Sequence, residues 1–252
     1  MSTVYYCEGG IALKSMGEET NTDAVAIYKN DLQVLSDLGR HPYIVGLLDM
    51  TSEAMISHVS TGVSEAVYNC QVLEALHGGE LFYHLVRHGP LSLETSRGFL
   101  QQLVVGVNHI HSQGYIHRDL KPWNLILSDD FSQIKIIDFG LATPLEPSQR
   151  QHPWSSFMPG TRQYMSPENI VRSSGERQAE SLQTADLSKV DTFALGVILI
   201  NMLTGNYLFE SCLAADYFAI VSDSNRLSRE LRQKMPHQIR DTELADLTKL
   251  LQ

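Results

Sequence analysis

Residues 117–140, HRDLKPWNLILSDDFSQIKIIDFG, bring together several side chains that could act on phosphate. The carboxylates of Asp119 and Asp138 lie in the same short segment as a basic group, Lys121, and an amide, Asn124. Carboxylate and amide oxygens suit Mg²⁺, and an ammonium group can neutralise a phosphate oxygen. Because phosphoryl transfer depends mostly on positioning and charge neutralisation, this cluster predicts that chemistry.

The segment contains, in order, an H-R-D tripeptide, an asparagine five residues after that aspartate, and a D-F-G tripeptide. This set resembles the catalytic loop and metal-binding turn of eukaryotic protein kinases. The resemblance implies that Asp119 accepts or orients the proton of a substrate hydroxyl and that Lys121 contacts the transferring phosphate. It also implies that Asn124 and Asp138 hold Mg²⁺. H-R-D alone would indicate little, but solvated charges are not expected to reproduce the whole ordered pattern.

The lysine in HRDLKPWN is typical of the serine/threonine subclass of this family, so the resemblance implies transfer to serine or threonine. Trp123 stands where many relatives that prefer basic substrates carry an acidic residue. Its presence does not favour recognition of arginine before the phosphorylated residue. The other interpretation of Trp123 is a packing aromatic side chain.

Two elements are expected to position this loop. Residues 91–112 place apolar side chains at helical spacing, with Ser92 and Glu94 near the start and Gly114 just beyond the end, which predicts a helix leading into the loop. Residues 134–137 form an aliphatic run. This run predicts a buried strand that delivers the D-F-G turn to the floor of a cleft.

Residues 72–85, VLEALHGGELFYHL, are similar to the segment that joins the two kinase lobes and to the short helix after it. Adenine binds there in the family, so the resemblance implies that Leu73 is the gatekeeper. It also implies that the Glu74 carbonyl and the backbone groups of Leu76 meet the adenine edge. Glu80 is expected near the ribose or a substrate side chain; alternatively, it is an acidic residue that interacts with a helix dipole.

Residues 159–169, PGTRQYMSPEN, resemble the segment that ends the activation loop and docks substrate. By this resemblance Thr161 bridges Asp119 and Lys121. Asp191 opens an apolar helical segment, and the resemblance implies that its carboxylate braces the backbone of the H-R-D turn.

The residues between D-F-G and S-P-E are rich in proline, serine and glutamine, which favours a mobile activation loop. Arg118 lies beside the catalytic aspartate, where an arginine often receives a phosphate from that loop. We therefore expect an upstream kinase to phosphorylate Ser156. The alternative is that Ser155 and Ser156 are polar loop residues without a regulatory role.

Lys14, within IALKSM, resembles the lysine that binds the α and β phosphates of ATP. Residues 25–29, VAIYK, also resemble this strand, but they lie too close to the following helix. That helix is expected from Asn30 onward, with Asp31 where relatives carry glutamate. Because aspartate is about 1.3–1.5 Å shorter, a Lys14–Asp31 pair would require the helix to lie further inward. Alternatively, Asp31 is an acidic residue at a helix N-terminus.

The resemblance implies that Val4 and Ala12 cover adenine on one side and that Ile126 covers it on the other. The glycine-rich loop of the family is expected before Val4, where the sequence has only residues 1–3. Residues 243–252 resemble the start of the helix that in relatives precedes a D-P-x-x-R turn. The domain is therefore expected to be shortened at both ends.

The chain has 252 residues, 43% of them hydrophobic, and a formal net charge of −10. It can bury a sizeable core, and its acidic balance argues against nucleic-acid or membrane-surface partners. Its apolar runs stop short of the roughly 18 residues of a transmembrane helix. Three cysteines without metal-ligand spacing indicate reduced thiols, so we expect a cytoplasmic or, alternatively, nuclear protein. Residues 51–66 are small and polar and predict an exposed insertion.

The resemblance covers nearly the whole chain and implies an α+β, bilobal protein-kinase-like fold for residues 1–252. Residues 1–74 would form a small, incomplete, β-rich lobe without the glycine-rich loop, and residues 75–252 a mainly helical lobe without its last helices. We expect a serine/threonine protein kinase that uses ATP and Mg²⁺ on protein substrates. The alternative is a catalytically impaired kinase-like module that acts as a nucleotide- or partner-binding scaffold.

Overall fold

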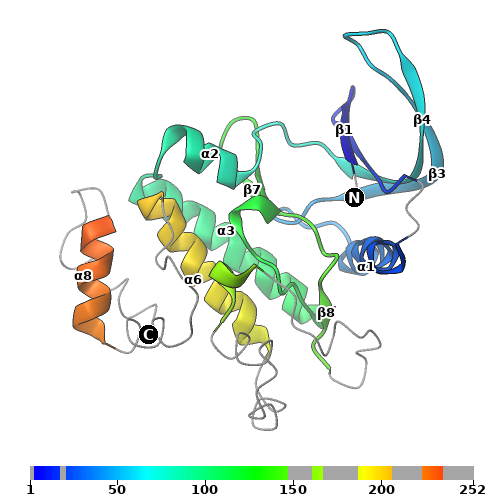
Figure 1. Ribbon diagram of the computed structural model, residues 1–252. Helices are drawn as coiled ribbons and strands as arrows, with labels where there is room; N and C mark the ends of the chain where they lie inside the picture. Colours follow the sequence, from blue (N-terminus) through cyan, green and yellow to red (C-terminus); the bar gives the residue numbers. More distant parts are fainter. Residues whose placement is uncertain (1–2, 18–20, 147–160, 167–186, 206–222, 235–252) are drawn as a thin grey trace.

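The computed structural model describes residues 3–17, 21–146, 161–166, 187–205 and 223–234. A curved sheet and one helix form a smaller N-terminal part, and helices dominate the rest of the described chain (Figure 1). The strands are β1 (Thr3–Cys7), β2 (Ile11–Ser15), β3 (Leu47–Ser57), β4 (Ser64–Glu74), β5 (Tyr115–Ile116), β6 (Leu125–Leu127), β7 (Ile134–Ile136) and β8 (Thr143–Pro144). The helices are α1 (Thr22–Leu38), α2 (Leu81–His88), α3 (Leu93–Ser112), α6 (Ser188–Thr204) and α8 (Ser224–Lys234), with 3-10 turns η1 (Pro122–Asn124) and η3 (Arg162–Tyr164).

The N-terminal sheet is antiparallel, with strand order β1-β2-β4-β3. In the pairing of β2 with β4, Ala12 lies opposite Leu73 and Lys14 lies opposite Gln71. Because side chains alternate along a strand and opposed residues share a face, these four side chains point to the same side of the sheet. On that side of the sheet, Lys14 forms an ion pair with Asp31 of α1.

The interpretation of residues 51–66 as an exposed insertion between strands was only partly right. The segment is largely exposed, but most of it belongs to the strands themselves, because β3 and β4 each run for 11 residues and pair down to Ser57 and Ser64. Small polar residues weaken the alternating pattern that marks a strand. Pairing between the two strands, which the local pattern does not show, stabilises the hairpin.

Helix α1 begins earlier than the sequence indicated. Its N-cap is Asn21, whose side chain accepts hydrogen bonds from the N–H groups of Asp23 and Ala24. Residues 25–29 are therefore helical, and the decision against a strand there is confirmed. Asp31 lies well inside the helix, so the alternative of an acidic residue at the helix N-terminus was wrong.

The larger part is built on α3 and α6, which lie side by side (Figure 1). The predicted helix at residues 91–112 is confirmed as α3, whose N-cap Ser92 accepts a hydrogen bond from the N–H of Thr95 at 3.1 Å. Helix α6 is apolar on nearly all sides and is correspondingly buried, with Ile198 fully enclosed. The described helices include none whose length and apolar character would allow it to cross a bilayer.

One apolar core connects the two parts. It contains Leu35 of α1, Phe139 of the D-F-G turn and Ile198 of α6. The predicted strand before that turn is confirmed as β7, whose residues are all buried, and β7 pairs with β6. The two parts therefore meet at the segment that carries Asp138.

Candidate active site

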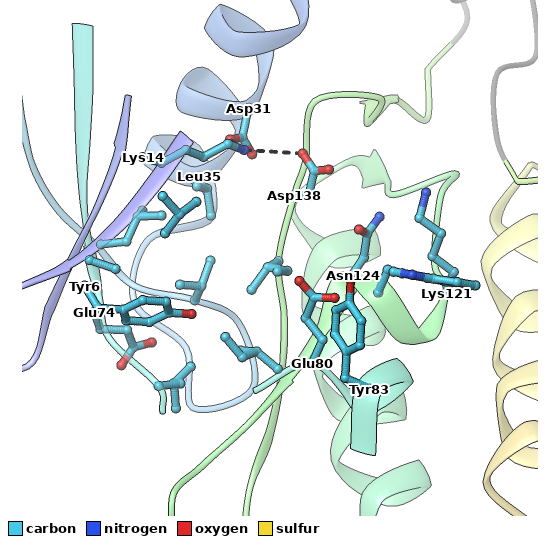
Figure 2. A pocket seen from close by; sticks show the side chains of 18 of the residues that line it. Tyr6, Lys14, Asp31, Leu35, Glu74, Glu80, Tyr83, Lys121, Asn124 and Asp138 are labelled. Carbon is cyan, nitrogen blue, oxygen red and sulfur yellow. Dashed lines mark hydrogen bonds and ion pairs between the residues drawn. The ribbon is translucent and has the colours of Figure 1, made fainter. Parts of the chain in front are cut away.

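A cavity of about 880 Å³ lies between the sheet, α1 and the loop that follows β5. Every site residue predicted from the sequence lines it except Asp119, which is nearly buried directly behind it. The lining residues are Val4, Tyr6, Ala12, Lys14, Asp31, Leu35, Val45, Leu73, Glu74, Leu76, Glu80, Tyr83, Lys121, Trp123, Asn124, Ile126, Ile137, Asp138 and Thr161. Figure 2 shows Lys14, Asp31 and Asp138 at one side and Glu80, Tyr83 and Lys121 at another.

One end of the cavity is an apolar slot between the two parts of the molecule. Ala12 and Leu73 are buried residues of the sheet, and Ile126 of β6, in the larger part of the molecule, also lines the cavity. Leu76 follows the end of β4, and its backbone N–H and carbonyl form no hydrogen bond with other described residues. An apolar slot beside free backbone groups can hold a flat heterocycle with polar edges.

Close backbone approach fixes the segment that joins the two parts. A Cβ on Gly78 would lie 2.3 Å from the Ser128 carbonyl oxygen and 2.6 Å from that of Leu127, so only glycine fits there. The carboxylate of Glu74 accepts hydrogen bonds from Lys135 Nζ at 2.6 Å and from the Gly46 N–H at 2.7 Å. The Glu74 side chain is therefore committed to structure, and its N–H donates to the Gly46 carbonyl at 3.0 Å, so the Glu74 carbonyl is the backbone group that could meet a ligand.

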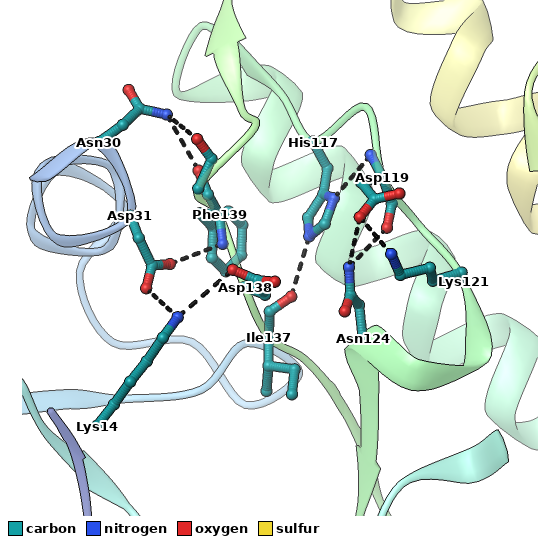
Figure 3. A network of polar contacts seen from close by, with 11 residues as sticks. Lys14, Asn30, Asp31, His117, Asp119, Lys121, Asn124, Ile137, Asp138 and Phe139 are labelled. Atoms are coloured by element: carbon teal, nitrogen blue, oxygen red, sulfur yellow. Dashed lines mark hydrogen bonds and ion pairs between the residues drawn. The ribbon is translucent and has the colours of Figure 1, made fainter. Parts of the chain in front are cut away.

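Lys14 forms an ion pair with Asp31, with Nζ 2.6 Å from Oδ2, and a longer contact of 3.4 Å with Asp138 Oδ1 (Figure 3). The other oxygen of Asp31 accepts the Phe139 N–H at 2.7 Å. The shorter carboxylate therefore reaches both partners, because α1 packs close to the D-F-G turn. The pairing required by the resemblance is present in the structure.

Electrostatics keep these groups charged. Burial disfavours the ammonium of Lys14, but Asp31 and Asp138 outweigh burial and raise the pKa of Lys14. For Asp138, burial favours the neutral acid, while Lys14 and His117 stabilise the anion, with the net result that the pKa of Asp138 is lowered. The site therefore presents an ammonium beside an ionised carboxylate at neutral pH.

A second polar cluster surrounds Asp119. Lys121 Nζ donates to Asp119 Oδ2 at 2.6 Å and to Thr161 Oγ1 at 2.9 Å. Thr161 donates to Asp119 Oδ1 through its N–H at 3.1 Å and its hydroxyl at 3.2 Å. The Asn124 side-chain N–H group donates to the Asp119 carbonyl at 2.8 Å and to its Oδ2 at 3.2 Å. Thr161 thus joins Asp119 and Lys121, and the amide oxygen of Asn124 is left to act as an acceptor.

Asp191 stabilises the backbone of the H-R-D turn through hydrogen bonds, as predicted. Its buried carboxylate accepts the N–H groups of His117 and Arg118, each at 2.9 Å, and lies 2.8 Å from His111 Nε2. Arg118 has a positive φ of 70°, a conformation that a non-glycine residue rarely adopts. The two amide hydrogen bonds therefore stabilise a backbone turn that would otherwise be unfavourable.

The mouth of the cavity near Lys121 is aromatic. Trp123 stacks on Phe82 with ring centroids 3.7 Å apart and an interplanar angle of 18°, which confirms the interpretation as a packing side chain. Glu80 is the N-cap residue of α2 but makes no capping hydrogen bond with its side chain, which instead lines the cavity. Burial raises the pKa of Glu80.

The model of the family described as "Protein kinase domain" matches residues 3–251 of this chain. The chain belongs to the protein kinase family. Its α+β fold, with a small sheet-containing part and a larger helical part, is that of the family, and its catalytic loop and D-F-G turn lie together as the resemblance implied.

Known kinases cover different portions of the chain. Ribosomal protein S6 kinase beta of Caenorhabditis elegans is 39% identical over 53% of this chain and 22% of its own length. CBL-interacting serine/threonine-protein kinase 18 of Arabidopsis thaliana is 33% identical over 79% of this chain and 34% of its own length. Sperm motility kinase 3A of Mus musculus is 29% identical over 88% of this chain and 39% of its own length. This kinase chain thus spans well under half the length of these relatives.

Sequence analysis missed some lining residues of the kinase cavity, namely Tyr6, Val45, Tyr83 and Ile137. Tyr6 shares a strand face with Val4, so the period of two would have indicated it. The others are placed only by packing between elements. Ser156 and residues 243–252 lie outside the part of the kinase that the structure describes.

Proposed function

We propose that this protein is a serine/threonine protein kinase that transfers the γ-phosphate of ATP to protein hydroxyl groups. The observation that carries the proposal is one continuous cavity that contains the Lys14–Asp31 pair at one end and Lys121 with Thr161, both bonded to Asp119, at the other. A nucleotide site and an acceptor site therefore share one space. The relatives named as serine/threonine kinases support the choice of acceptor.

The apolar slot suits adenine. Val4, Ala12 and Ile126 would enclose the ring, and Leu73 would limit its depth. The Glu74 carbonyl and the backbone groups of Leu76 would meet its polar edge. Glu80 would lie near the ribose or a substrate side chain. Lys14, held by Asp31, would bind the α and β phosphates.

Asn124 and Asp138 fit a Mg²⁺ site. The Asn124 N–H group is engaged by Asp119, which leaves the amide oxygen as its available donor atom for a metal, and Asp138 is stabilised as an anion. No group of three or more His, Cys, Asp or Glu side chains gathers as a metal site among the described residues. Mg²⁺ is usually held by one or two protein ligands together with substrate phosphates, and Asn124 and Asp138 would be the protein ligands here. When bound, Mg²⁺ would neutralise charge on those phosphates.

At the acceptor end, Asp119 would accept or orient the proton of the substrate hydroxyl. Its carboxylate is fixed by Lys121, Thr161 and Asn124, so its orientation does not have to be set during the reaction. Lys121 carries a positive charge into the same space and would stabilise the phosphate as negative charge develops on it.

The test is transfer of labelled phosphate from ATP with Mg²⁺ to a mixed serine/threonine peptide library. We compare the wild type with Asp138→Asn and with Asp49→Asn, a matched charge change on exposed β3 away from the cavity. Transfer should fall at least about a hundredfold in Asp138→Asn and stay unchanged in Asp49→Asn. Equal background in the wild type and Asp138→Asn would reject the enzyme. Nucleotide binding without transfer would instead favour the scaffold alternative.

The remaining parts of the proposal concern the substrates, the activation and the cellular location of the protein. We propose protein substrates with serine or threonine acceptors, activation by a kinase that phosphorylates Ser156, and a cytoplasmic location. The acidic net charge of −10 supports partners other than nucleic acid or membrane surfaces.

A further inference from the structure

Two adjacent side chains of α1 form hydrogen bonds with the backbone of the D-F-G turn and the residues just after it, one as an acceptor and the other as a donor (Figure 3). Asp31 accepts the Phe139 N–H at 2.7 Å. Asn30 Nδ2 donates to three backbone carbonyl oxygens, those of Phe139 at 3.1 Å, Gly140 at 3.0 Å and Ala142 at 2.9 Å. Because an amide group has only two N–H bonds, at least one of them is shared between two carbonyls.

Helix α1 packs closely against the third residue of the turn, Gly140. A Cβ on Gly140 would lie 2.5 Å from Ile27 Cγ2, so the third residue of D-F-G must be glycine for α1 to pack against it. Ile27 and Asn30 are three residues apart and therefore lie on the same face of the helix. This face contacts the turn through one apolar and one polar side chain.

The turn needs external support because its first residue is in an unfavourable conformation. Asp138 has a positive φ of 65°, which costs a non-glycine residue about 1–2 kcal/mol. Inside the turn, the Ala142 N–H bonds to the Phe139 carbonyl at 3.0 Å. The same Phe139 carbonyl oxygen also accepts a hydrogen bond from Asn30 Nδ2. Asn30 of α1 is therefore bonded to the oxygen whose hydrogen bond with the Ala142 N–H closes the turn.

We propose that Asn30 is a positioning residue that fixes the metal-binding turn against α1 and thereby orients Asp138. Asn30 is not among the residues that line the cavity, so it acts through the backbone of residues 139–142. The catalytic consequence rests on the proposed kinase function, whereas the backbone contact can be tested without it.

Two variants separate hydrogen bonding from simple packing. Asn30→Ala removes the donor and most of the volume. Asn30→Asp keeps the shape but places carboxylate oxygens against three carbonyl oxygens, so the contact becomes repulsive. If donation is what matters, Asn30→Asp is the more damaging change; if Asn30 only fills space, Asn30→Ala is. The control is Asn21→Asp, the same substitution on the same helix, where the side chain accepts hydrogen bonds and the cap is retained.

The first measurement is amide hydrogen exchange of residues 137–143 in the protein without nucleotide. Exchange at the Phe139 and Ala142 amides should rise about tenfold in Asn30→Ala and further in Asn30→Asp, with no change in Asn21→Asp. Unchanged exchange in Asn30→Ala would overturn the proposal. This outcome does not depend on whether the protein transfers phosphate.

The second measurement is steady-state kinetics with varied Mg²⁺ at saturating ATP. A displaced Asp138 should raise the KM for Mg²⁺ about five- to tenfold and lower kcat about tenfold, again more in Asn30→Asp. General destabilisation would reduce the amount of active protein without changing that KM, and this pattern would reject the positioning role. If the wild type shows no transfer, the proposed function fails, and hydrogen exchange alone decides whether Asn30 holds the turn.

Discussion

Asp31→Glu, which restores the residue usual in relatives, should impair this protein rather than improve it. Asp31 is 1% exposed, and its carboxylate is already at hydrogen-bonding distance from both partners, Lys14 at 2.6 Å and the Phe139 N–H at 2.7 Å. A longer side chain would place its oxygens too far toward both partners. To relieve the overlap, α1 would have to move outward, away from a core in which Val34 and Leu35 are buried.

The expected magnitude follows from overpacking. An extra methylene in a well-packed interior costs about 1–3 kcal/mol. If this cost falls on the arrangement that aligns Lys14 with the phosphates, kcat/KM for ATP falls about 5- to 150-fold, at about 1.4 kcal/mol per tenfold. Asp31→Asn is the comparison, since it keeps the shape but removes the charge-assisted bond to Lys14, which is worth about 1.5–3 kcal/mol.

The assay combines steady-state kinetics with the affinity for ATP and the midpoint of thermal unfolding for the wild type and both variants. Asp31→Glu should lose affinity and unfold at a lower temperature than the wild type, because the added group strains the interior. If Asp31→Glu matches or exceeds the wild type in both affinity and kcat/KM, space does not limit the carboxylate and the reasoning is wrong. Unfolding and binding report this result even without measurable turnover.

Three further predictions address stability, pH and regulation. Gln71 is fully buried and neither of its amide atoms has a hydrogen-bond partner within the described ranges, so Gln71→Met should raise the free energy of unfolding in urea by about 1–2 kcal/mol; no gain would contradict this. Burial and the bond to Asp37 raise the pKa of Tyr115 from 10.0 to about 12, so the folded state keeps the proton longer and loses stability as the pH rises between these values. Tyr115→Phe should lose less stability over this range, and equal losses would exclude Tyr115 as the cause. Ser156→Ala should prevent activation by an upstream kinase, and full activity together with no Ser156 phosphopeptide in the wild type would reject Ser156.

The catalytic loop could be predicted from the sequence because its geometry is local. Asp119, Lys121 and Asn124 lie within six residues, and only Thr161 and Asp191 had to be assumed as more distant supports. A short loop with fixed spacing leaves few ways to arrange such side chains. The residues predicted to line the nucleotide slot were also placed together, because strand alternation and the ordered motifs constrain them strongly.

Other features depended on contacts between distant segments. Residues 51–66 lack a strong alternating pattern, and only pairing of β3 with β4 shows that they are largely strand. The start of α1 was missed because residues 25–29 suit a strand as well as a helix when considered alone, whereas the Asn21 cap and packing on the core select the helix.

The sequence by itself determined the family, the set of chemical groups and the pairing of Lys14 with Asp31 as a candidate. It could not determine whether the shorter carboxylate would reach, because that distance is set by how closely α1 packs on the turn. The tertiary structure decided this point through Gly140, which admits Ile27, and through Asn30 and Asp31, which bond to backbone more than 100 residues away. The sequence specifies which side chains are present, but the distances between elements that are remote in the sequence are set only by tertiary packing.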